Sequence, residues 1–232
     1  MRVFPRDIAK IIADYYAELK ILDWIDPDYI EYTYADILYA NTNALKAGML
    51  DLSNPRELYK QEGEYCEYFG RNPAAGDILE KSTNLEFCID SMWSNPAVFD
   101  WLMKQNVRID HGWLARNPNP RAIAHLIANL SKLNDEDRDL LSTNPGMMSW
   151  LLKDPKRISR SHICANPAAI DIIRDMSHDE IDYQWLSDNP HPWAIEQLSK
   201  NRNLIDWESF MMNPGIFELR ADDELLRTLL EL

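Results

Sequence analysis

The stretch WLSDNPHPW, residues 185–193, contains an Asn-Pro pair that recurs along the chain. A close variant, WLARNP, occupies residues 113–118. The pair begins at positions 54, 72, 95, 117, 144, 166, 189 and 213, so from position 72 onward the steps lie between 22 and 27 residues. A period in the twenties is typical of stacked supersecondary units. The sequence therefore predicts a repeat protein.

Two fixed offsets from the asparagine carry apolar residues in each of the seven later repeats. Three residues before it lie Phe69, Met92, Leu114, Leu141, Ile163, Leu186 and Phe210. Six residues after it lie Ile78, Trp101, Ile123, Trp150, Ile172, Ile195 and Leu219. We expect both offsets to be core positions. Asn54 has Asp51 and Lys60 at these offsets and is interpreted as a look-alike or a decayed unit.

The Asn-Pro pair has the chemistry to end one helix and begin the next. Proline disfavours helical geometry at the residue before it, so the incoming helix ends at the asparagine. Asparagine is a good N-cap, and proline is favoured at the first helical position. The residue seven before the asparagine is expected to cap the short helix that precedes the pair, at Asp110, Ser159, Asp182 and Asp206.

These signals predict an all-α, solenoid-like stack of two-helix repeats with a period of about 22–24 residues. We expect an N-terminal helical cap over residues 1–50, the Asn-Pro array over 51–220 and a C-terminal capping helix over 221–232. Helix-like patterns cover residues 5–20 and 27–40, and NTNALK at 41–46 resembles a repeat start in which Thr42 replaces the proline. The leucine stripe of residues 225–230 is expected to cover the last repeat, or else to contact another chain.

Composition narrows the classes of function. The net charge of −14 disfavours binding to nucleic acid, whose phosphates attract Lys and Arg. It is typical of a plain acidic soluble protein, and it also suits a basic partner or a surface that imitates nucleic acid. Three cysteines, Cys66, Cys88 and Cys164, make no disulfide framework and favour a reducing compartment. Without a signal-peptide pattern or a membrane-spanning stretch, we expect an intracellular protein.

Motifs that carry catalytic or metal-binding chemistry are missing from the sequence, which has no P-loop, GxGxxG, GxSxG or HExxH pattern. His162 and Cys164 form at most a weak zinc half-site, and their positions in the repeat predict packing instead. DEDRD at 135–139 is interpreted as a solvated turn, with a cation site or an interaction loop as alternatives. We expect no cofactor, no metal and no enzymatic activity; a site among the Tyr and acidic residues of 27–36 is the remaining enzymatic alternative.

Two features are candidate contacts for a protein partner. KDPKRISR at 153–160 is a local basic cluster in an acidic chain, and it contains Lys153, Lys156, Arg157 and Arg160. Among the eight tryptophans, Trp101, Trp113, Trp150 and Trp185 occupy core slots of the repeat. Trp24 and Trp193 lie outside those slots, so they are the better candidates for exposed contacts.

The segments 151–173, 185–198 and 205–219 combine the Asn-Pro phrase with an isoleucine-x-tryptophan phrase or its variants. In this they resemble the Asn-Pro repeat proteins abundant in large double-stranded DNA viruses of algae and amoebae. The resemblance covers about residues 64–220 and transfers no catalytic residue. It implies a viral interaction or assembly protein, either virion-associated or binding a host protein. The alternative is an acidic inhibitor that mimics nucleic acid.

Overall fold

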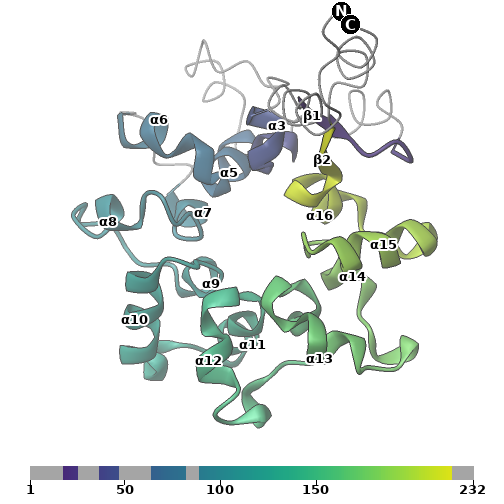
Figure 1. The fold of residues 1–232 in the computed structure, drawn as a ribbon. Helices are drawn as coiled ribbons and strands as arrows, with labels where there is room; N and C mark the ends of the chain where they lie inside the picture. Colours follow the sequence, from purple (N-terminus) through teal and green to yellow (C-terminus); the bar gives the residue numbers. More distant parts are fainter. Residues whose placement is uncertain (1–17, 26–36, 47–63, 82–88, 221–232) are drawn as a thin grey trace, which may run out of the picture.

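The computed structural model describes residues 18–25, 37–46, 64–81 and 89–220. Within these ranges the chain is mostly helical, and two short strands are its only extended elements. Figure 1 shows that the helices follow one another around a circle, which brings the first described residues beside the last. The helical class predicted from the sequence is confirmed, whereas the strand pair was not foreseen.

The elements are short and occur in chain order. The first part holds β1 (Glu18–Ile21), a 3₁₀ helix at Ile37–Ala40, α3 (Thr42–Lys46), α5 (Glu64–Arg71), α6 (Gly76–Lys81), α7 (Ile89–Met92) and α8 (Phe99–Leu102). The middle holds α9 (His111–Ala115), α10 (Pro120–Ala128), α11 (Asp135–Leu140), a 3₁₀ helix at Leu141–Thr143, α12 (Met148–Leu151) and a 3₁₀ helix at His162–Ala165. The last part holds α13 (Ile170–Arg174), α14 (Tyr183–Leu186), α15 (Pro192–Lys200), α16 (Trp207–Met212) and β2 (Phe217–Arg220).

Within the described residues, the Asn-Pro pairs that begin at 95, 117 and 189 each join an inner helix to an outer helix. Figure 1 places α7, α9, α14 and α16 toward the middle of the circle, and α6, α8, α10 and α15 toward its outside. Some of the predicted caps form: Asn72, Asn144, Asn166 and Asn213 each cap a 3₁₀ turn whose first residue is the proline. At the Asn117 and Asn189 junctions the outer helix begins two residues later than predicted and is capped by Asn119 and His191. Asp206 makes no side-chain capping bond, and the 3₁₀ helix at His162–Ala165 follows Ser161 rather than Ser159. At the four junctions with a 3₁₀ turn the following α-helix is shorter than the sequence suggests, whereas α10 and α15 are α-helical over nine residues each.

The side-chain amides of the asparagines also link consecutive units by hydrogen bonds, which the sequence did not predict. Nδ2 of Asn144 donates to the backbone oxygens of Ala115 and Asn117 at 2.9 and 2.8 Å, while its Oδ1 accepts from the amide of Gly146 at 3.0 Å. The same links, to one or both carbonyls of the preceding unit, are made by Asn41, Asn72, Asn95, Asn117, Asn166, Asn189 and Asn213. All eight side chains are at most 2% exposed. We call this set the asparagine ladder.

The asparagine ladder closes on itself. Nδ2 of Asn41 donates to the oxygens of Met211 and Asn213 at 2.9 and 2.8 Å, the same pair of bonds that five of the other members make to the unit before them. The segment at 41–46 thus takes the place of a repeat start, as its sequence suggested, and Thr42 stands where the others have proline. The chain forms a circuit in which the first unit follows the last, rather than an open stack with capped ends.

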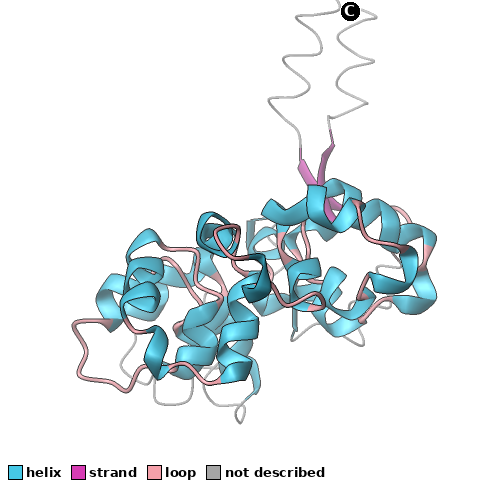
Figure 2. Ribbon diagram, turned by 90° about the horizontal axis from the view of Figure 1, so that it is seen from below, coloured by secondary structure: helices cyan, strands magenta, loops and turns pink. Residues whose placement is uncertain are grey.

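A two-stranded antiparallel sheet reinforces the closure. Glu18 pairs with Arg220 and Ile21 with Phe217, and Figure 2 shows the two strands together beside the helices. The sequence predicted helix over residues 5–20, and for residues 18–20 that prediction is wrong, because their backbone pairs with β2 instead. Residues 1–17, 47–50 and the expected capping helix of 221–232 lie outside the described residues, as does Asn54.

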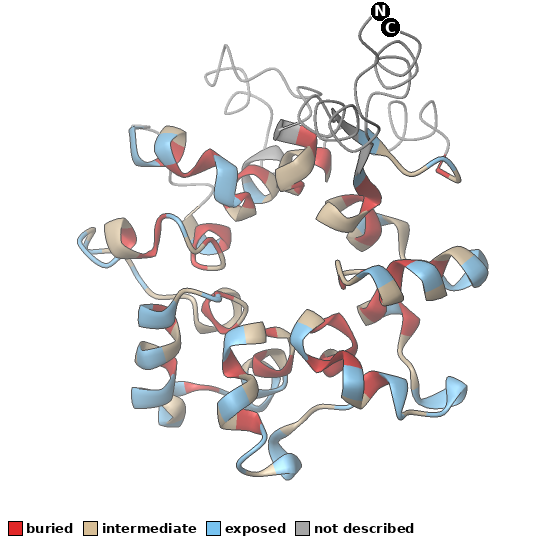
Figure 3. Ribbon diagram, viewed as in Figure 1, coloured by how far each residue is buried: buried red, intermediate tan, exposed pale blue. Residues whose placement is uncertain are grey.

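The core lies between the inner and the outer helices, where Figure 3 shows the buried residues. All seven residues three before the asparagine are at most 1% exposed, which confirms that offset. The second offset is only partly right, since Ile78, Trp101, Ile123, Trp150 and Ile172 are half-buried. The deeper positions come one residue later, at Leu79, Leu102, Leu151 and Ile173. One residue is 100° of helix rotation, which turns the earlier side chain toward the neighbouring unit.

The side chain six residues after a ladder asparagine packs against a glycine of the next unit in two places. A Cβ added to Gly146 would overlap Cδ1 of Ile123, and one added to Gly215 would lie 2.9 Å from Cδ1 of Ile195. Each glycine is two residues after a ladder asparagine, and each isoleucine is six residues after the previous one. Neighbouring outer helices therefore approach closely at this point.

We expect Gly146→Ala to lower the free energy of unfolding by about 1–3 kcal/mol, as overpacking does. Urea denaturation measures the change. Ile123→Val removes the overlapping Cδ1 atom, so the double variant Ile123→Val/Gly146→Ala should recover part of the loss in a double-mutant cycle. A loss of the same size with and without the Ile123→Val substitution would contradict the packing explanation.

Candidate functional site

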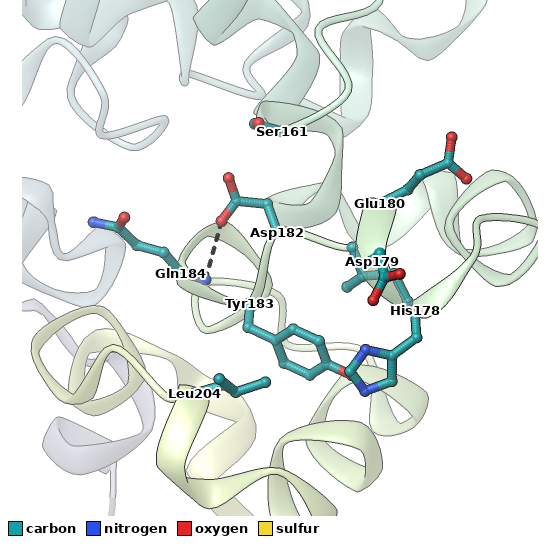
Figure 4. A pocket seen from close by; sticks show the side chains of 9 residues that line it. Ser161, His178, Asp179, Glu180, Asp182, Tyr183, Gln184 and Leu204 are labelled. Carbon is teal, nitrogen blue, oxygen red and sulfur yellow. Dashed lines mark hydrogen bonds between the residues drawn. The ribbon is translucent and has the colours of Figure 1, made fainter.

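An outer hollow of about 520 Å³ gathers titratable residues near α14 (Figure 4). Oδ1 of Asp182 accepts from the backbone amides of Gln184 and Trp185 at 3.1 and 3.3 Å, so it caps α14. Glu180 accepts from Ser177 and pairs with Arg160, and the bonds from Ser177 hold the pKa of its carboxyl below the usual range. These two carboxylates serve the local fold, and in the same hollow Nε2 of His178 lies 3.4 Å from the hydroxyl of Tyr183.

A second hollow, of about 230 Å³, lies on the inner side of the circuit between α5, α9, α14 and α16. Seven of its nine lining residues come from two repeat positions, the residue directly before the ladder asparagine and the residue four before it, and Gln184 and Asp206 complete the lining. The first position supplies Arg71, Arg116, Asp188 and Met212, and the second supplies Trp113, Trp185 and Ser209. The two positions are one helical turn apart and so share a face, whereas the core residue three before the asparagine points elsewhere. We call this hollow the inner cavity.

Flat side chains form a stack across the inner cavity. The guanidinium carbon of Arg71 lies 5.1 Å from the ring centroid of Trp113. The guanidinium carbon of Arg116 lies 5.7 Å from the Trp113 centroid and 5.5 Å from the Trp185 centroid. The Trp185 ring continues to His162, with centroids 4.2 Å apart. Cation–π attraction thus links units that are not neighbours along the chain.

Burial perturbs the charged groups of the inner cavity. Desolvation, followed by the positive charge of Arg71, lowers the pKa of Arg116, and Asp188 and Glu67 oppose this effect. Desolvation raises the pKa of Asp188, and the positive charges of Arg71 and Arg116 oppose it. In the described part of the chain, no ion pair within 4 Å joins Asp188 to either arginine. The opposite charges attract across the cavity without neutralising each other by contact.

The two tryptophans predicted to be exposed contacts are half-buried. Trp24 stacks on Phe210 with centroids 5.5 Å apart and carries Arg202 at 5.0 Å. Trp193 packs against the core and carries Arg174 at 5.7 Å. Conversely, Trp113 and Trp185, which the repeat register places in core slots, line the inner cavity. The pattern finds the correct helices but does not tell which face meets the interior of the circuit.

The predicted basic cluster is exposed and partly paired. Lys153, Lys156, Arg157 and Arg160 all lie at the surface. Arg157 makes an ion pair with Asp154 at 3.5 Å and covers the Trp150 ring at 4.3 Å, while Arg160 pairs with Glu180. The structure does not gather the four cations into one site, because two of them are engaged with local acids.

The His/Cys pair and the acidic run have structural surroundings. Cys164 is buried, and desolvation raises the pKa of its thiol. The ring of His162 lies against that of Trp185 at an interplanar angle of 36°, and burial lowers the pKa of His162. DEDRD, interpreted as a solvated turn, instead forms α11, because Asn134 and Asp137 build a capping box. In the ranges that the structure describes, no three His, Cys, Asp or Glu residues gather as ligands for a metal ion.

Within the described ranges, no helix combines the length and the apolar character that crossing a bilayer requires. Comparison of the chain with family models, with curated proteins and with solved structures finds no match.

Proposed function

We propose that this chain is a non-enzymatic interaction or assembly protein that binds a protein partner along its outer face. The resemblance of its repeats to viral Asn-Pro repeat proteins supports a role in a virus, either in the virion or on a host protein. The observation that carries the proposal is a row of exposed apolar side chains on consecutive outer helices.

The row consists of Met103, Ile127 and Leu152, which are 44%, 40% and 55% exposed. Met103 and Leu152 are each eight residues after a ladder asparagine. Ile127 is eight residues after Asn119, the residue that caps the outer helix of its unit. Three successive repeats therefore present an apolar side chain at an equivalent position. We call this set the outer row.

Direct contacts join the helices that carry the outer row. Arg121 at the start of α10 makes an ion pair with Asp100 of α8 at 2.7 Å. On its other side, α10 places Ile123 against Gly146 at the start of the next outer helix. Lys153 follows Leu152 directly, so one end of the row has exposed positive charge beside it. Aligned apolar anchors with a polar rim are typical of protein-binding surfaces.

The experiment is affinity capture from the native source with a triple variant, Met103→Ser/Ile127→Ser/Leu152→Ser, read by mass spectrometry. We expect the native chain to capture a partner, and the triple variant to capture at most about one tenth as much of it, because apolar anchors dominate such interfaces. Leu204→Ser is the matched control, since Leu204 is 40% exposed but lies outside the row. Circular dichroism and the melting temperature check that each variant is folded.

The same capture separates the proposal from nucleic-acid mimicry. Apolar binding persists when salt rises from about 0.1 to about 0.5 M, whereas binding through carboxylates weakens steeply. A different result is a captured partner that is basic, dissociates at high salt and binds the triple variant as well as the native chain. That result would contradict the proposal that the outer row binds the partner. Recovery of the chain within assembled particles would favour a virion role, and capture of one host protein would favour a host-binding role.

A further inference from the structure

We propose that the inner cavity is a binding site for a small oxyanion, held by Arg71 and Arg116. This site is separate from the outer row, and it rests on the geometry of the two guanidinium groups rather than on the proposed partner.

Among the described residues, most N–H groups of the two guanidinium groups have no hydrogen-bond acceptor. Nη1 of Arg71 donates to Sδ of Met212 at 3.1 Å, and sulfur is a weak acceptor. Among the described residues, neither arginine donates to any other acceptor. The tryptophan rings take up the flat faces of the guanidinium groups, but the N–H groups of arginine point outward in the plane, where carboxylates and phosphates bind.

The two positive charges line the same cavity. Because both guanidinium carbons lie near one centroid, at 5.1 and 5.7 Å, they are less than 11 Å apart. Arg71 disfavours the charged form of Arg116, and an anion between them would relieve this repulsion. Asp188 and Asp206 also line the cavity, and desolvation, with a smaller effect of the Asp206 charge, raises the pKa of the Asp188 carboxyl.

The size of the cavity limits the ligand. A volume of about 230 Å³ is below the roughly 300–1,000 Å³ typical of sites for drug-sized molecules. It has room for about eight waters at about 30 Å³ each. Inorganic phosphate or a small carboxylic acid meets this limit, and both offer the paired oxygens that a guanidinium group recognises.

Calorimetric titration with inorganic phosphate tests the site, and potassium chloride at matched ionic strength shows what screening alone does. We expect saturable binding of phosphate that Arg116→Gln and Arg71→Gln each weaken about tenfold or more, the effect of losing a charged hydrogen bond. Arg174→Gln is the matched control, because Arg174 also lies over a tryptophan, Trp193, but away from the cavity. It should bind phosphate as the native chain does.

A parallel titration with succinate distinguishes the two sources of the oxyanion. Tighter binding of succinate than of phosphate would assign the site to small carboxylic acids, and the reverse order would assign it to phosphates. Arg116→Lys keeps the charge but loses the planar fork, so it should weaken binding even if the glutamine variant does not fold. The proposal is overturned if neither anion binds beyond the chloride control, or if the folded arginine variants bind as tightly as Arg174→Gln.

Discussion

Replacing Asn144 by alanine is expected to lower the free energy of unfolding by about 3–5 kcal/mol, a large share of the roughly 5–15 kcal/mol that a domain has. The substitution removes two donated hydrogen bonds and one accepted bond in a side chain that is 0% exposed. The carbonyls of Ala115 and Asn117 then lose a partner in a place that excludes water. Each unsatisfied buried polar group costs about 1–3 kcal/mol.

A serine at the same position distinguishes the two roles of Asn144, which are to cap the following turn and to link its unit to the preceding one. Serine caps helices about as well as asparagine, so Asn144→Ser should be nearly neutral if the residue is only a cap. It has no amide to reach the preceding unit, so the asparagine ladder predicts a loss close to that of alanine. Urea unfolding followed by circular dichroism measures both variants.

The control is Asn129→Ala, because Asn129 is half-buried and donates only within its own helix, to His125 at 2.8 Å. Its expected cost is about 1 kcal/mol, that of one ordinary hydrogen bond. If Asn144→Ser and Asn129→Ala destabilise the chain equally, the links between units contribute little and the ladder is not what holds the repeats together.

The ladder also shows where reasoning from the sequence stops. The register predicted Leu114 and Leu186 as core and Asp110 and Asp182 as caps, and all four are found in those roles. These are local consequences of helix geometry. A signal for the ladder was present too, because Asn recurs at every junction although Ser or Asp would cap as well. Only asparagine has both an acceptor and two donors on one short side chain.

The inner cavity could not be predicted in the same way. Trp113 and Trp185 have the apolar spacing of core residues, and the sequence does not tell that their units face one another across a circuit. That fact depends on closure, which joins residues about 170 positions apart. For the same reason Trp24 was expected to be exposed, although closure places it on Phe210 of the last unit.

Closure changes how destabilisation should be distributed along the chain. In an open repeat array the end units have one neighbour, so a substitution there frays the end, whereas a substitution in the middle affects units on both sides. In a circuit no unit is an end. Asn41, in the first unit, makes the same two donated bonds as Asn144 and is also 0% exposed.

We therefore expect Asn41→Ala to destabilise the chain by about 3–5 kcal/mol, within about 1 kcal/mol of Asn144→Ala, with a single unfolding transition for both. Denaturation with urea gives the two free energies, and hydrogen exchange shows whether amides on both sides of the closure lose protection together. An open chain would give a different pattern, in which Asn41→Ala costs under about 1 kcal/mol and loses protection only near its own unit. The comparison needs both variants, because a large loss at Asn144 alone occurs in either architecture, and only an equal loss at Asn41 requires the ring.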